Sequence, residues 1–161
     1  MKIRKWFALG LALLILVMMG CSKSDNNSPP ATSTFAPDMA KEWMDLCYRA
    51  VKGSSISPPV ASRIYGFVGV TLYEALVPGM PEHVSLVGQL DALSSLPQPK
   101  HNTRYDWPTV ANNAVATVMT SFFSNAPDSI RNEIKSLQDS WNVKRQAAVA
   151  AEVYDLSLIH I

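Results

Sequence analysis

Apolar residues recur at helical spacing through most of the chain after residue 38. Asp38 is a residue type that caps helices, and the residues after it place apolar side chains on one face at intervals of three and four. This pattern predicts a helix from Asp38 to Gly53. Its buried stripe consists of Met39, Trp43, Leu46, Cys47, Ala50 and Val51.

A second helix is predicted from Pro58 to Leu76. Ser57 supplies a cap, and the two prolines that follow it fit only the first turn of a helix, where a missing N–H is tolerated. Apolar residues occupy nearly every side of this segment. We therefore expect it to be covered on several sides and to form the centre of the core.

Two charged residues, Arg63 and Glu74, interrupt this apolar second helix. Their spacing places them on one face but about 16 Å apart, too far to pair with each other. Each needs a partner elsewhere, either as a buried polar contact to a neighbouring helix or as a residue that lines a pocket. Gly66 and Gly69 remove side chains from one stripe, which predicts the close approach of another backbone.

The remaining pattern is also helical. Asp106 and Asp128 offer caps, and Pro-containing stretches separate the periodic segments. No two-residue alternation competes and no internal repeat is present, so the sequence predicts an all-α protein, a partial helical bundle. The further predicted segments are an amphipathic stretch around residues 86–93, helices over 107–123 and from 128, and a last helix over 143–154.

The first residues predict an export signal. Three basic residues precede an uncharged apolar run over residues 6–20, and Cys21 follows. This run is shorter than the roughly 20 residues that cross a bilayer as a helix. Residues 1–20 are therefore interpreted as a lipoprotein signal peptide that is cleaved before Cys21. The basic residues are Lys2, Arg4 and Lys5.

Cys21 is the predicted site of lipid attachment, and its acyl chains would hold the mature chain at a membrane of the cell envelope, in the periplasm or at the outer membrane. Met18 and Met19 depart from the usual lipobox, which leaves an ordinary secretory signal as the alternative. Residues 21–37 are rich in Ser, Asn, Pro and Thr and are expected to form a flexible tether.

Charge and cysteine content exclude several classes of partner. Without residues 1–20 the basic residues fall from 14 to 11 against 13 acidic ones, a formal charge of −2. This balance gives no excess of basic residues that would bind nucleic acid, and only the lipid anchor indicates a membrane partner. With Cys21 acylated, Cys47 has no disulfide partner and is expected to be a buried small hydrophobe rather than a nucleophile.

The last six residues, 156–161, break the pattern in another way. Leu-Ser-Leu-Ile-His-Ile can be encoded by CTG TCT CTT ATA CAC ATC, which is similar to the end sequence of a transposase-based sequencing adapter. We interpret the segment as an artefact, so that His160 is not a feature of the protein and the natural chain continues past Asp155.

No motif of metal, phosphate or hydrolase chemistry is present in the sequence. His83 and His101 have no Cys or carboxylate at metal-ligand spacing, and there is no Gly-rich phosphate loop, Gly-x-Ser-x-Gly elbow or HExxH. Neither a catalytic nor a metal-binding residue is predicted. Three tryptophans are expected to pack in the core rather than to stack on a ligand, namely Trp43, Trp107 and Trp141.

One block of sequence does resemble a known family. The run SPPVASRIYGFVGVTLYEAL over residues 57–76, followed by Pro-Gly-Met-Pro at 78–81, Tyr-Asp-Trp at 105–107 and Val-Ala-Asn at 110–112, is similar to the N-terminal helical region of vanadium-dependent haloperoxidase-related proteins. These belong to the phosphatidic acid phosphatase type 2 (PAP2) superfamily. The resemblance covers roughly residues 38–155, the expected N-terminal helical part of such a domain.

The resemblance implies a helical bundle whose C-terminal half binds vanadate or phosphate. In the family, a Lys and two Arg neutralise the oxyanion, one His bonds to it and another acts as acid or base. The corresponding motifs are Lys-x6-Arg-Pro, Pro-Ser-Gly-His and Ser-Arg-x5-His-x3-Asp, and none occurs in this sequence. The chain is thus expected to be a truncated, inactive fragment that lacks the C-terminal half of its own domain and carries no cofactor itself.

Two interpretations remain open. The intact parent is a phosphatase or haloperoxidase for which this chain supplies scaffold helices, or the chain is a non-catalytic helical lipoprotein that binds a partner or a small molecule. A truncated bundle would leave the apolar second helix partly uncovered, so we expect a marginally stable chain that associates with itself.

Overall fold

The computed structural model describes residues 30–159. Within that range the chain is all-α, with five α-helices, two short 3-10 turns and no strand. The prediction of an all-α fold is confirmed. The elements are η1 (Thr32–Thr34), α2 (Asp38–Gly53), α3 (Pro58–Leu76), η2 (Val77–Gly79), α4 (Trp107–Phe122), α5 (Asp128–Gln146) and α6 (Ala151–Ile159).

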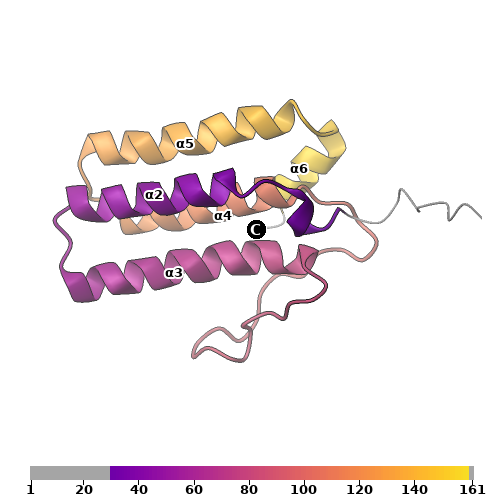
Figure 1. Cartoon of the computed structure of the whole chain (residues 1–161), viewed down its shortest axis with the longest axis horizontal. Coiled ribbons are helices and arrows are strands. Elements are labelled where there is room, and N and C mark those ends of the chain that lie inside the picture. The colour runs from indigo at the N-terminus through magenta and orange to yellow at the C-terminus, as the bar shows by residue number, and fades with distance from the viewer. Residues whose placement is uncertain (1–29, 160–161) are drawn as a thin grey trace, which may run out of the picture.

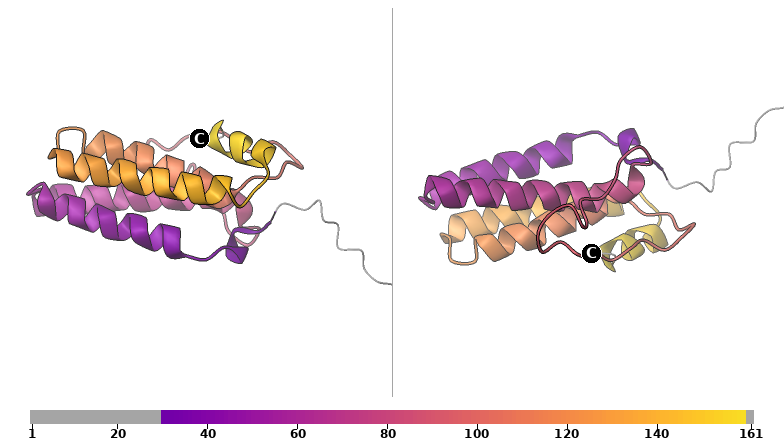
Figure 2. Two further views of the ribbon diagram at one scale, coloured as in Figure 1. Left: turned by 90° about the horizontal axis from the view of Figure 1, so that it is seen from above. Right: turned by 90° about the horizontal axis from the view of Figure 1, so that it is seen from below.

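Four long helices form a bundle. Helices α5 and α3 lie on opposite sides of the bundle, α2 lies in front of α4 in the view of Figure 1, and α6 crosses one end. The chain enters at the end where α3 finishes and α4 begins, and both further views show the same arrangement (Figure 2). The predicted signal residues 1–20 and lipid-bearing Cys21 lie outside the described residues.

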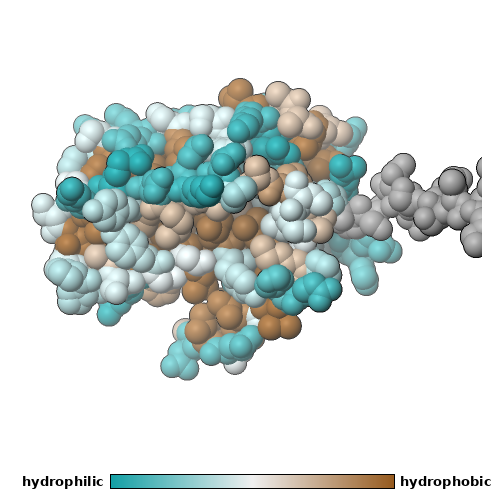
Figure 3. Space-filling model, viewed as in Figure 1, coloured by the Kyte–Doolittle hydropathy of each residue, from teal (hydrophilic) through white to brown (hydrophobic). Residues whose placement is uncertain are grey.

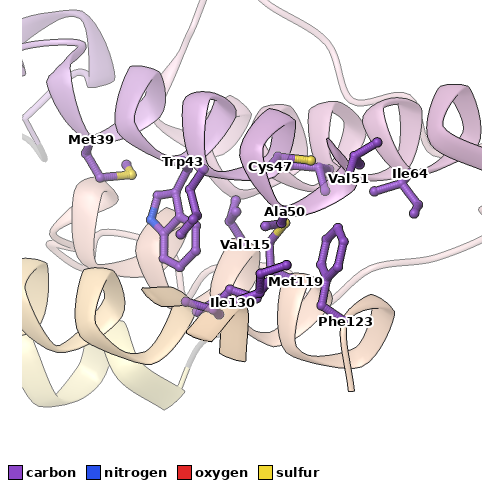
Figure 4. Close-up of a cluster of buried hydrophobic side chains, with 14 of the residues drawn as sticks. Met39, Trp43, Cys47, Ala50, Val51, Ile64, Val115, Met119, Phe123 and Ile130 are labelled. Carbon is purple, nitrogen blue, oxygen red and sulfur yellow. The ribbon is translucent and has the colours of Figure 1, made fainter. Parts of the chain in front are cut away.

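The core lies between α2, α3, α4 and α5. The predicted α2 stripe is buried without exception, from Met39 to Val51. It packs against Val115, Met119 and Phe123 at the α4 side and Ile130 from α5 (Figure 4). The three tryptophans expected in the core are also buried, with Trp43 fully enclosed. Burial of these apolar groups supplies the main driving force for the bundle.

The centre of the core is α4, and not the second helix as the sequence predicts. Ten residues of α4 are buried, from Trp107 to Met119, whereas α3 buries only Ala61, Ile64 and Val68. Helix α4 contacts each of its neighbours α2, α3, α5 and α6. Apolar composition therefore overestimates the burial of α3, because no described element covers its outer side at the Pro58 end.

The last part of the predicted tether, from residue 30 on, is ordered. Residues 30–37, which we call the strap, are docked on the bundle rather than free. The Thr32 hydroxyl donates to the Leu76 carbonyl at 3.0 Å, and the Trp107 indole N–H donates to the Pro30 carbonyl at 3.2 Å. Phe35 packs beside Trp107 in a second apolar cluster. Two specific hydrogen bonds and one aromatic ring thus order a segment whose composition is typical of disorder.

Three other boundaries differ from the predicted ones. The stretch around residues 86–93 forms turns, because Gly88 and Ala92 take left-handed backbone conformations with φ of 75° and 65° that interrupt a helix. The last predicted helix is broken, since α5 runs on to Gln146 and α6 starts only at Ala151. Asp38 is the first residue of α2 and makes no capping hydrogen bond.

Residues 156–159, part of the segment interpreted as adapter-derived, continue α6. Ser157 is buried, accepts from the Asp106 backbone N–H at 2.8 Å and donates to the Val153 carbonyl at 2.6 Å. The origin of these residues in the DNA stays a prediction, because the packing of a translated segment does not reveal how its codons arose.

Candidate functional site

The two charged residues predicted on α3 occupy different environments. Arg63 is exposed, and among the described residues it has no hydrogen bond or ion pair. Glu74 is half-buried and accepts from the Ser85 hydroxyl at 2.7 Å and the Leu86 backbone N–H at 2.6 Å. The structure therefore does not bring the two residues into one site.

Glu74 serves to anchor the irregular segment between η2 and α4. The neighbouring Tyr73 hydroxyl donates to the Val84 carbonyl at 2.7 Å, so two consecutive residues of α3 hold the same loop. Glu74 also lines a cavity of about 200 Å³ beneath that loop, whose other walls are mostly apolar and include Val70, Leu93 and Val110. Glu74 is thus a pocket-lining residue, although its oxygens already have backbone and hydroxyl donors.

A buried ion pair joins the start of α4 to α5. Asp106 is 2 % exposed and receives two hydrogen bonds from Arg145, at 2.9 Å from Nε and 2.6 Å from Nη2. As the predicted cap of α4, Asp106 also accepts from the Thr109 backbone N–H at 3.2 Å and from its hydroxyl at 2.6 Å. The carboxylate is fully engaged in structure, so it is a fixed support rather than an acid or base.

A second polar network crosses the interior, and sequence reasoning did not find it. The Asn112 amide is fully buried: its oxygen accepts from the Trp43 indole at 2.8 Å, and its nitrogen donates to Asn142 at 3.0 Å. Asn113 and Gln138 extend the network at 2.9 Å. The signal available in the sequence was Asn112, a polar residue on the buried face of α4. Because its partners on α2 and α5 are distant in sequence, the network itself could not be predicted.

Nucleophilic and metal-binding side chains do not converge. Cys47 is fully enclosed, as predicted, and burial raises the pKa of its thiol to about 11. His83 and His101 are exposed and line different cavities. No group of three or more His, Cys, Asp or Glu in residues 30–159 could hold a metal ion.

The open face of α3 is the most distinctive surface. Phe67 is 52 % exposed and stacks at 5.7 Å on Phe122, and Val60 is 47 % exposed. A Cβ added at Gly66 or Gly69 would meet no atom within 4 Å, so the predicted close backbone is not found in the described residues. Apolar surface gathers beside α3 and on the loop below it, whereas hydrophilic residues dominate over α5 (Figure 3).

Comparisons with known protein families, characterised proteins and solved structures found no match. In the described residues, Pro58–Gly79 is the one helical stretch long and apolar enough to cross a membrane, with 22 % of its window buried. This is weak evidence for a span, because the same stretch packs in the bundle against α4.

Proposed function

We propose that this chain is the scaffold part of an exported, lipid-anchored protein of the PAP2 and vanadium haloperoxidase-related type, in which the catalytic residues belong to another part of the parent protein. The observation that supports this proposal best is the open face of α3. Phe67 and Phe122 form an exposed apolar ridge beside the notch at Gly66 and Gly69. A ridge beside a side-chain-free notch is suited to the packing of a further helix.

The resemblance block coincides with this open face. The most specific parts of the resemblance, Pro-Pro-Val-Ala-x-Arg-x-Tyr at 58–65 and Tyr-Glu-Ala at 73–75, both lie in α3. In the proposed parent, helices of the catalytic half would cover Gly66 and Gly69 and bury Phe67. Arg63, exposed and unpaired among the described residues, would then meet an acidic or polar partner there.

The residues of this chain do not fit a vanadate or phosphate site. Such a site needs a Lys and two Arg directed at one oxyanion. In the described part of the chain, Arg49, Arg131 and Arg145 pair with carboxylates, and the two other arginines are exposed on separate elements, Arg63 on α3 and Arg104 in the loop before α4. We therefore assign no step of phosphoryl or halide chemistry to this chain.

Activity assays test the proposal directly. The purified chain is given a chromogenic phosphomonoester, and separately bromide, peroxide and a phenol dye with added vanadate. We expect neither ester hydrolysis nor dye bromination above a blank without protein. Turnover in either assay that persists through repurification would contradict a scaffold role.

A non-catalytic binding role is the second candidate, and one observation favours it. A groove of about 440 Å³ lies between the strap and η2, with walls that are mainly apolar. Grooves of this size and character are common sites for small ligands. Reading the parent gene separates the two roles, because only the scaffold role requires the three catalytic motifs further along the same frame.

A further inference from the structure

The groove beside the strap is lined mainly by apolar residues. One wall is the strap with the first turn of α2, and the other is the end of α3 with η2 and the residues after it. Glu82 and His83, the ionisable lining residues, are both exposed. The apolar lining includes Ala31, Phe35, Met39, Leu76, Met80 and Pro81.

The buried polar group in this lining is already satisfied. The Thr32 hydroxyl, with only 9 % of the residue exposed, donates to the Leu76 carbonyl at 3.0 Å. A polar ligand entering the groove would lose water without gaining a buried partner, which costs free energy. The groove therefore favours a flexible apolar ligand that fills space rather than one that is held by directed hydrogen bonds.

The course of the chain places this groove near lipid. Pro30 is the first described residue and lies at the groove end of the bundle, where its carbonyl is fixed by Trp107. Cys21, the proposed lipid attachment site, precedes it by nine residues. Even fully extended, that length reaches only roughly 30 Å. With Cys21 acylated, the groove stays within roughly this reach of the bilayer. The Gly53 end of the bundle lies about 28 Å farther from the point of attachment along α3.

We infer that the groove between the strap and η2 receives an acyl chain of a bilayer lipid, so that this end of the bundle rests on the membrane surface. The inference depends on the anchoring at Cys21 that is part of the proposed function. It extends that function, because it assigns a lipid-binding groove and an orientation to the bundle itself.

Photolabelling of the intact, acylated chain tests the inference. The chain is reconstituted into vesicles of phosphatidylethanolamine and phosphatidylglycerol that contain a phosphatidylcholine with a diazirine near the end of one acyl chain. After illumination, the labelled peptides are identified by mass spectrometry. We expect labels in residues 31–40 and 76–83. Labels confined to residues before Pro30, or the absence of any label, would overturn the inference. The chain's own acyl groups carry no diazirine, so a groove filled by them would also remain unlabelled.

A groove-filling variant gives the matched comparison. Ala40 lines the groove, whereas Ala148 is an exposed alanine outside it. Ala40→Trp should reduce labelling of residues 31–40 and 76–83 at least fivefold, and Ala148→Trp should leave it unchanged. Equal labelling in both variants contradicts the groove assignment. If Ala40→Trp melts below the wild type, the wild-type labelling map alone decides the question.

The proposed anchor at Cys21 and the proposed lipid-binding groove can be tested separately. The mass of the N-terminal peptide shows whether Cys21 carries acyl chains, and an unmodified peptide contradicts the proposed anchoring. The groove is then tested by adding the same vesicles to the unmodified chain. Labelling of residues 31–40 and 76–83 in that case would support the lipid-binding groove even though the chain carries no anchor.

Discussion

Polar residues inside the bundle act as structural connectors. Asn112 joins α4 to Trp43 of α2 and to Asn142 of α5, and Asp106 joins α4 to Arg145. Each of these buried groups has partners from other helices, so the free energy of burying it is offset only when the helices have the correct register. The chemistry of this interior is therefore that of a specified packing arrangement and not that of an active site.

Removing the Asp106 carboxylate should be the most damaging change to this interior. Asp106→Ala leaves Arg145 mostly buried without its partner and uncaps α4, so the free energy of unfolding should fall by about 3 to 5 kcal/mol. Asp128→Ala is the matched control, because its ion pair with Arg131 is exposed and contributes about 1 kcal/mol or less. Urea denaturation followed by circular dichroism measures both. Equal losses in the two variants would argue against the role given to Asp106.

At this scale the sequence predicted individual environments well and pairings poorly. The burial of Cys47 and the capping role of Asp106 follow from local pattern, and both are found. Ser57 and Asp128, predicted as caps from the same pattern, make no capping hydrogen bond. The partners of Arg63 and Glu74 were left open, and Glu74 contacts a loop rather than a helix. A partner eleven or more residues away depends on the tertiary path of the chain, which periodicity does not contain.

The long helices were predictable because each has a strong apolar period and clear ends. The bounds of α2 and α3 agree with the prediction, and α4 ends one residue earlier, at Phe122. The strap was missed because its order comes from two hydrogen bonds to distant backbone and indole groups. Three leucines at helical spacing led to the prediction of an amphipathic segment after η2, where the chain instead forms turns at Gly88 and Ala92.

Two glycines should respond in opposite directions to the same substitution. A Cβ at Gly79 would overlap Thr32 and the Trp107 indole, so Gly79→Ala should displace the strap and lower the free energy of unfolding by about 1 to 3 kcal/mol. Gly66 lies within a helix with open space around it, so Gly66→Ala should raise that free energy by about 0.5 to 1 kcal/mol.

Thermal and urea melts measure both effects. Protection of the strap backbone amides from hydrogen exchange gives a second readout, which should fall in Gly79→Ala only. A Gly66→Ala variant that loses stability would indicate that another backbone does approach α3 within this chain.

The distribution of apolar surface at the scale of the molecule is uneven. Phe67, Val60 and Phe122 are exposed on or beside α3, and Val84 and Leu90 are exposed on the loop beneath it. On α5, Val143 is an isolated exposed apolar residue. Exposed apolar residues gathered around one helix are typical of an interface, whereas single exposed residues are ordinary.

We therefore predict that the isolated chain associates through α3. Residues 22–161, produced without lipid, should form concentration-dependent oligomers in sedimentation velocity runs. Phe67→Ser should weaken this association several-fold, because it removes half of the exposed aromatic ridge. Val143→Ser, a change of similar exposure on α5, should have no effect. A wild-type chain that remains monomeric at every concentration would show that the open face does not need a partner.

The most direct test of the account as a whole is a long read of the parent DNA through the codon for Asp155 and beyond. We predict that the frame continues and encodes the segments Lys-x6-Arg-Pro, Pro-Ser-Gly-His and Ser-Arg-x5-His-x3-Asp, whose helices would cover α3. A stop codon that directly follows Ile161 in the genome would contradict the scaffold role, and the chain would then be a small helical lipoprotein without catalysis.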